Sequence, residues 1–145
     1  MREFVKIREK AEILNVLQGF SDVFPHLCEK IDSLDAYAEK LSQFAEFCIG
    51  TEDGVPFGLA VFYANDMQSK TAYISLIGVK SSHRSQGLGY WLLTNCENAA
   101  RARSMTQLRL EVDLDNPTAI AFYERNGFSL CGHTQRGSMY MSKYI

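Results

Sequence analysis

The chain has 145 residues, 46% of them hydrophobic and 22% charged, which is the size and composition of one globular domain spanning residues 1–145. A formal net charge of −2 excludes a general electrostatic attraction to nucleic acid or to an anionic membrane. No apolar run reaches the roughly 18 residues needed to cross a bilayer, and the mixed-charge N-terminus lacks an apolar signal core, so we expect a cytoplasmic protein.

The N-terminal part of the chain is predicted to contain one strand followed by two helices. Residues 2–7 alternate apolar and polar side chains, which is the pattern of a half-buried strand. Apolar residues then recur at helical spacing over residues 9–19 and about 34–46, and Ser33 precedes the second of these helices.

The next part of the chain is predicted to form three strands. Strands at about residues 47–51 and over residues 55–64 flank Asp53-Gly54, a dipeptide typical of tight hairpin turns. Residues 71–79 form the third strand. Its apolar side chains face both ways, so we expect it at the centre of the sheet.

The C-terminal half alternates helices and strands. Residues from Gly87 to about 103 are predicted to be helical, and residues 107–114 alternate as a strand does. Asn116 can cap a short helix, and Gly127 suits the left-handed residue that ends it. Two further strands follow, over about residues 128–133 and 138–144. This order predicts an α/β or α+β sheet with helices on its faces.

The cysteines and histidines are too scattered for a zinc or redox motif. We therefore expect reduced, mostly buried thiols and no metal site. The residues concerned are Cys28, Cys48, Cys96, Cys131, His26, His83 and His133.

The segment of residues 82–90 has the features of a phosphate-binding loop. It follows a predicted central strand and opens a helix, whose free amides and dipole favour an anion. Gly87 and Gly89 let a ligand approach the backbone closely, and Lys80, His83 and Arg84 add positive charge. The alternative is a helix that merely begins with glycines, although helix N-termini usually prefer Ser, Thr, Asp or Asn.

Two other phosphate loops fit the sequence poorly. A Walker A loop requires Gly-Lys followed by Ser or Thr, which is absent, and a dinucleotide fingerprint requires a small residue where Leu92 stands. An unrelated nucleotide-binding module is therefore disfavoured.

Two segments of the chain resemble the signatures of the GNAT N-acetyltransferases. Arg84-Ser85-Gln86-Gly87-Leu88-Gly89 matches their Arg/Gln-x-x-Gly-x-Gly/Ala motif, and Ile77-Gly78-Val79 resembles the strand before it. Residues 115–128 look like their Asn-x-x-Ala-x-x-x-Tyr-x-x-x-Gly-Phe motif. Together the matches cover about residues 71–130, while the N-terminal third agrees only in the order of its elements.

The resemblance implies a mixed, mostly antiparallel sheet of about seven strands flanked by about four helices. It also implies acetyl-CoA as co-substrate, with the amides of residues 85–90 on the pyrophosphate and the backbones of Ile77 and Val79 on the pantetheine. Asn116 would contact the cofactor arm and Tyr123 would lie near the thioester sulfur. The full set of implied cofactor-binding residues is Ile77, Gly78, Val79, Arg84, Ser85, Gln86, Gly87, Leu88, Gly89, Tyr90 and Asn116.

Direct acetyl transfer requires a neutral amine, a donor to the oxyanion and a proton or hydrogen bond for the departing thiolate. Tyr123 is the predicted general acid, because a tyrosine with a pKa of about 10 is protonated at neutral pH. The predicted oxyanion donor is an amide near Ile77 or Gly78, the glycine permitting unusual backbone geometry. The base stays open between a water chain, a substrate amine that enters neutral, and the side chains of Glu111, Asp113, Asp22 and His26.

The acceptor site is expected to form from residues 20–26, Tyr63, Tyr73 and the last strand loop near Arg136. This mixture of aromatic and polar groups suits a small polar amine, and a protein N-terminus is the alternative. Members of the family often dimerise through their C-terminal strands. A catalytically silent acyl-CoA sensor on the same fold is the second interpretation; Tyr123 argues against it.

Overall fold

The computed structural model describes residues 1–25, 27 and 33–145. Seven strands form one sheet in the order β1-β2-β3-β4-β5-β7-β6. The strands are β1 (Arg2–Ile7), β2 (Glu46–Glu52), β3 (Val55–Tyr63), β4 (Thr71–Val79), β5 (Gln107–Asp113), β6 (Ser129–His133) and β7 (Ser138–Tyr144). The helices of the described part are α1 (Lys10–Gly19), α3 (Leu34–Phe44), α4 (Leu88–Ala102) and α5 (Pro117–Arg125), with a 3₁₀ turn, η1 (Ser81–His83).

The predicted mixed sheet is confirmed. All neighbouring strands are antiparallel except β4 and β5, which run parallel. Three strands lie on each side of β4 in the sheet order, so residues 71–79 form the central strand, as their apolar pattern predicts. The Asp53-Gly54 turn has φ angles of 51° and 83°, the left-handed pair that a tight hairpin requires.

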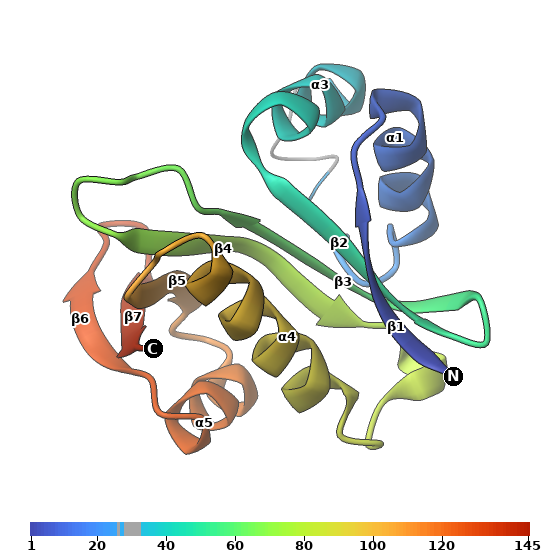
Figure 1. Ribbon diagram of the computed structural model, residues 1–145. Coiled ribbons are helices and arrows are strands. Elements are labelled where there is room, and N and C mark those ends of the chain that lie inside the picture. The colour runs from blue at the N-terminus through green and yellow to red at the C-terminus, as the bar shows by residue number, and fades with distance from the viewer. Residues whose placement is uncertain (26, 28–32) are drawn as a thin grey trace.

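The helices cover the sheet in two pairs on opposite sides (Figure 1). Buried side chains of α1 and α3 pack on one face, and the sheet residues of this cluster come from β1 to β4. On the other face α4 packs over β3, β4, β5 and β7, and α5 contributes partly buried side chains to the same cluster. The corresponding face of β5 and β7 on the first side carries half-buried polar residues, among them Arg109, Glu111 and Tyr140.

The strands β4 and β5 pair over only four residues and then separate. The last paired residues are Ile74 and Leu110. Against β3, Val61 faces Leu76 while the next residue faces Ile74, which leaves Ser75 as an extra residue in β4. A bulge of this kind bends its strand. Ser75 therefore marks the point at which β4 turns away from β5, and the two strands open into a wedge.

Helix α5 begins and ends as its sequence predicts. The Asn116 side chain accepts a hydrogen bond from the amide of Ala119 (3.1 Å), and Pro117 occupies the first turn. Gly127 has a φ of 94°, and the ring of Phe128 packs on Tyr123 with 5.6 Å between centroids. These caps fix the helix that faces the wedge.

No helix in the described part of the chain combines the length and apolar character needed to cross a membrane. The same residues contain no group of three or more side chains arranged to hold a metal ion.

Candidate functional site

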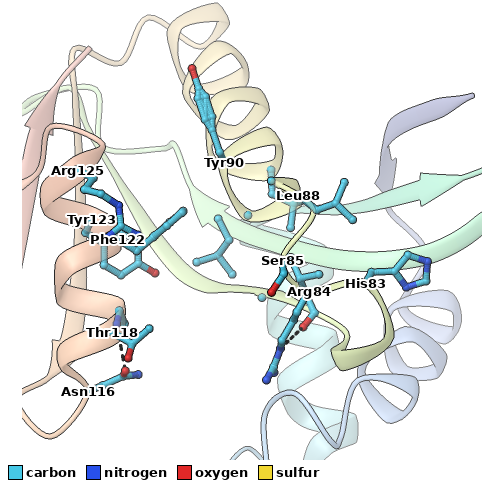
Figure 2. Close-up of a pocket in the computed structure, with 17 residues that line it drawn as sticks. His83, Arg84, Ser85, Leu88, Tyr90, Asn116, Thr118, Phe122, Tyr123 and Arg125 are labelled. Atoms are coloured by element: carbon cyan, nitrogen blue, oxygen red, sulfur yellow. Dashed lines mark hydrogen bonds between the residues drawn. The ribbon is translucent and has the colours of Figure 1, made fainter.

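A cavity of about 720 Å³ lies between the end of β4, the loop that leads into α4, and α5 (Figure 2). Ten of the eleven expected cofactor-binding residues line it, and so does Tyr123. Gln86 does not line the cavity; it is exposed in the turn between Ser85 and Gly87. The structure therefore brings together two motifs that are about thirty residues apart in the chain.

The loop before α4 presents a run of unpaired amides. Ser85 and Gly87 have left-handed φ angles of 67° and 73°, which is an uncommon conformation for a serine. The first amide bonded in the helical pattern is that of Trp91, which donates to the Gly87 carbonyl (3.1 Å). Among the hydrogen bonds of the described residues, none uses an amide of residues 85–90 as donor. These amides, at the positive end of α4, form a site for an anion.

The basic residues of the loop have structural contacts of their own. Arg84 Nε donates to the Val79 carbonyl (3.3 Å), which joins the loop to the end of β4. His83 stacks on Phe57 with 5.9 Å between ring centroids and bonds to the Ser82 hydroxyl (2.8 Å). His83 also lines the cavity, and its imidazole points away from α5 in Figure 2.

The glycines of the loop have different physical roles. Gly87 caps α4 in the left-handed conformation, where any side chain causes strain. Gly89 has an ordinary helical backbone, and a Cβ placed there meets only the Phe122 ring, at 3.5 and 3.6 Å. A side chain at residue 89 thus projects across the cavity from α4 toward α5.

The end of β4 offers backbone groups to the wedge. The Lys80 amide donates to Phe57 on the β3 side (2.8 Å), and successive residues of a strand point their backbone groups to opposite edges. The backbone N–H and C=O groups of Gly78 therefore point toward β3, while those of Ile77 and Val79 point toward the open edge beside β5. This is the geometry that backbone contacts to an extended cofactor arm require.

The expectation of unusual backbone geometry at Gly78 is wrong. Its φ is not in the left-handed region, and it pairs with Leu59 as an ordinary strand residue. A Cβ at residue 78 would lie 2.7 Å from Val23 Cγ1 and 3.0 Å from Phe24 Cζ. Glycine is required here because the chain after α1 packs directly on the strand, and the candidate oxyanion amide is that of Ile77.

Tyr123 lies on α5 and faces the cavity. Its ring is held at its edges by Phe122 and Phe128, with 5.4 and 5.6 Å between centroids. Burial raises the pKa of Tyr123 to about 12, so the hydroxyl is protonated at neutral pH. Among the described residues, the Tyr123 hydroxyl has no hydrogen-bond partner. Every fully buried side-chain oxygen in that part of the chain does have a partner, so the Tyr123 oxygen must be accessible from the cavity.

Several polar side chains gather on the open face of β5 and β7, next to the wedge. Both carboxylate oxygens of Glu111 accept a bond from Arg136 Nη2 at 3.2 Å, and Oε2 also accepts a bond from the Ser138 hydroxyl. Tyr73 is half-buried beside Arg109, and burial and the Glu111 charge raise the pKa of its hydroxyl. This group, here called the β5 polar cluster, consists of Tyr73, Arg109, Glu111, Arg136, Ser138 and Tyr140.

The remaining acceptor and base candidates lie in different environments in the structure. Tyr63 and Tyr73 are cross-strand partners on β3 and β4, and their place in an acceptor site stays a prediction. Phe20 is a core residue with 2% exposure beneath Lys80, so its expected place in the acceptor site is wrong. Asp22 and Asp113 are exposed. His26 lies outside the described residues.

The cavity includes residues that the motifs do not single out. They lie mainly on the α5 face that carries Tyr123, and they are Leu92, Thr118, Ala119, Phe122 and Arg125. Spacing alone could have found those on α5, because residues three and four apart share one face of a helix.

A family pattern and individual known proteins match this chain. Residues 13–128 match the acetyltransferase (GNAT) family. N-alpha-acetyltransferase 30 of Schizosaccharomyces pombe is 30% identical over 95 residues, 63% of this chain and 63% of that protein. Streptothricin acetyltransferase of Streptomyces lavendulae is 36% identical over 84 residues, 58% of this chain and 43% of that protein. The matched part of the chain therefore spans 63% of the first relative's length and 43% of the second's.

A solved structure resembles the whole chain. The ribosomal-protein-S18-alanine N-acetyltransferase from Escherichia coli has a TM-score of 0.78 at 22% identity, covering 100% of this chain and 94% of that one. At this identity the likeness establishes a shared fold. Because the family pattern extends over residues 13–128, most of its length, the chain belongs to the acetyltransferase (GNAT) family.

Proposed function

We propose that this protein is an acetyl-CoA-dependent N-acetyltransferase that passes the acetyl group directly to a primary amine of a small molecule. The observation that supports this most is the row of unpaired amides at residues 85–90, beside an open strand edge and a free tyrosine hydroxyl. These three features suit the diphosphate, the extended arm and the thioester end of one acyl-CoA molecule.

The residues present fit the co-substrate. The amides of residues 85–90 would bind the pyrophosphate, since they converge at the positive end of α4. Ile77 and Val79 would bond the amide groups of the arm as a neighbouring strand would, and Asn116 can use its side-chain NH₂ because its oxygen caps α5. The co-substrate supplies the activated acetyl group; everything else in the transfer is positioning, charge stabilisation and proton movement.

Tyr123 is proposed to assist the departing thiolate. An ordinary thiol has a pKa of about 8.5, so complete proton transfer from a hydroxyl with a pKa of about 12 is uphill. The tyrosine therefore acts chiefly as a hydrogen-bond donor that stabilises the developing thiolate. Its ring contacts with Phe122 and Phe128 keep the hydroxyl aimed into the cavity.

Glu111 is the proposed base of the reaction. It is half-buried one residue beyond the last β4–β5 pair, at the mouth of the wedge, whereas Asp113 and Asp22 are exposed. Its bonds from Arg136 and Ser138 hold the carboxylate in place, where it would take a proton from the attacking amine. An ion-paired carboxylate is a weak base, and we expect the proton to pass through a water at near-neutral pH.

The test is binding followed by turnover. Calorimetry with CoA and with acetyl-CoA should show one site per chain, and a thiol-release assay should then show turnover across amino sugars, polyamines, amino acids and peptide N-termini. Failure to bind either CoA species would refute the proposal. Binding without release of thiol for any amine would identify a silent acyl-CoA sensor instead.

A further inference from the structure

The β5 polar cluster contains one positive charge that nothing in it balances. Arg109 and Arg136 are the two cations, and Glu111 is the carboxylate bonded to Arg136. Asp113 is the next acidic residue on this face and lies four residues along the strand from Arg109, roughly 13 Å away. No carboxylate or other hydrogen-bond acceptor within the described ranges is paired with the Arg109 guanidinium.

The surroundings of Arg109 hold the guanidinium in place without neutralising it. The guanidinium carbon lies 4.3 Å from the centroid of the Tyr140 ring, a stacked cation–π contact. Its backbone pairs with Tyr73 on one side and Ser142 on the other, so the side chain projects from the middle of the open face. Arg109 is half-buried. Partly removing a guanidinium from water is unfavourable unless an anion completes its bonds.

The position of Arg109 points to the acceptor rather than to the co-substrate. It lies one residue before the last β4–β5 pair, at the apex of the wedge, and Glu111 lies two residues further on the same face. Residues two apart in a strand are roughly 7 Å apart, so a single small molecule can contact both side chains. Neither residue lines the cavity that faces α5.

We propose that Arg109 selects acceptors that carry a carboxylate beside the reacting amine, so that the enzyme acetylates an amino acid or a similar acidic amine. The carboxylate forms a charge-assisted bond with Arg109 while the amine faces Glu111 and the wedge. This inference rests on the proposed acetyltransferase function and names its substrate class. A peptide with an acidic side chain near its N-terminus offers the same chemistry, and the assay separates the two sources.

The experiment compares matched acceptors in the thiol-release assay. For each of several amino acids, the free acid is set against its amide and against the decarboxylated amine, and a dipeptide amide with one aspartate side chain forms a separate arm. We expect kcat/KM for the free acid to exceed that of its amide and amine by about tenfold or more. Preference for the dipeptide amide instead would place the carboxylate on a peptide.

Substitution of the arginine gives the second readout. Arg109→Gln should raise KM for the carboxylate acceptor at least about tenfold and leave KM for the decarboxylated amine unchanged. Arg109→Lys keeps the positive charge, so its KM for the carboxylate acceptor should lie between those of the wild type and Arg109→Gln. Arg103→Gln makes the same change of charge at the far end of α4, where Arg103 pairs with Glu46, and should change neither constant. Thermal unfolding of each variant checks that a change in KM does not result from a loss of the folded state.

The outcomes separate this inference from the function on which it rests. Turnover that ignores the carboxylate, or an Arg109→Gln effect equal for all acceptors, would overturn the role of Arg109 and leave the acetyltransferase intact. Absence of turnover with every acceptor would overturn both.

Discussion

At the scale of single residues, the cavity depends on what glycines leave empty and on one hydroxyl. Gly78 makes room for Val23 and Phe24, Gly87 adopts a left-handed turn, and Gly89 leaves a gap that faces Phe122. Adding a side chain is therefore expected to have a different consequence at each of the three glycines.

Gly89→Leu should weaken CoA binding without harming the fold. The new side chain enters the space between α4 and α5, but the nearest atoms are an ordinary van der Waals distance away and leucine favours a helix by roughly 0.5–1 kcal/mol over glycine. We expect a Kd for CoA at least about tenfold higher by calorimetry, with an unchanged or higher Tm. Gly19→Leu, at the end of α1 with no atom near its Cβ, is the matched control and should not change the Kd.

Tyr123→Phe should lower kcat at least about tenfold while leaving CoA affinity nearly unchanged, because the hydroxyl is required only as the thiolate forms. The raised pKa gives the sign of the pH dependence: the hydroxyl donates only while protonated, so the wild-type rate should not fall between about pH 8 and 10 on account of Tyr123. Tyr144→Phe, on an 81% exposed residue, serves as control. An unchanged kcat would remove Tyr123 from the mechanism.

At the scale of elements, most boundaries could be predicted because their signals are local. Alternation defines β1 and β5, the Asp53-Gly54 turn defines the β2–β3 hairpin, and the Asn116 and Gly127 caps define α5. The Ser75 bulge, the place of Phe20 in the core and the bond from Arg84 to Val79 could not be predicted. They depend on which strand or loop packs against which, and residues distant in sequence decide that.

The cap of α5 allows its structural and binding roles to be separated. Asn116→Ala removes the bond to the Ala119 amide and should cost about 1 kcal/mol, which lowers Tm by roughly 2–4 °C. Asn116→Asp keeps an oxygen for the cap but loses the side-chain NH₂, so we expect a nearly native Tm together with weaker CoA binding. Equal CoA affinity in the aspartate variant would exclude Asn116 from the cofactor contacts.

At the scale of the whole molecule, the sheet consists of two parts joined by a short seam. Only four residue pairs connect β4 to β5, and α4 reinforces the connection by packing across both parts. Glu97 on α4 also pairs with Lys143 on β7, with 2.6 Å between Nζ and Oε1. The open half of the seam is the part that a ligand can fill.

CoA should therefore stabilise the molecule and protect the seam. A ligand at about 100 times its Kd adds about 2.7 kcal/mol of stability, which for a chain of this size raises Tm by roughly 5–10 °C. Hydrogen exchange should slow at the amides of Ile77 and Val79, which face the open edge, more than at Gly78, which already faces β3. Equal slowing at all three amides would contradict an arm bound along β4.

The wedge also bears on solubility. An unpaired strand edge is ordinarily a template on which another chain can add and begin an aggregate. Here the vacant edge belongs to the innermost strand, where α4 and α5 flank it and the neighbouring strand of the same sheet limits access. The molecule can thus keep backbone groups ready for a slender ligand without presenting them to a second polypeptide.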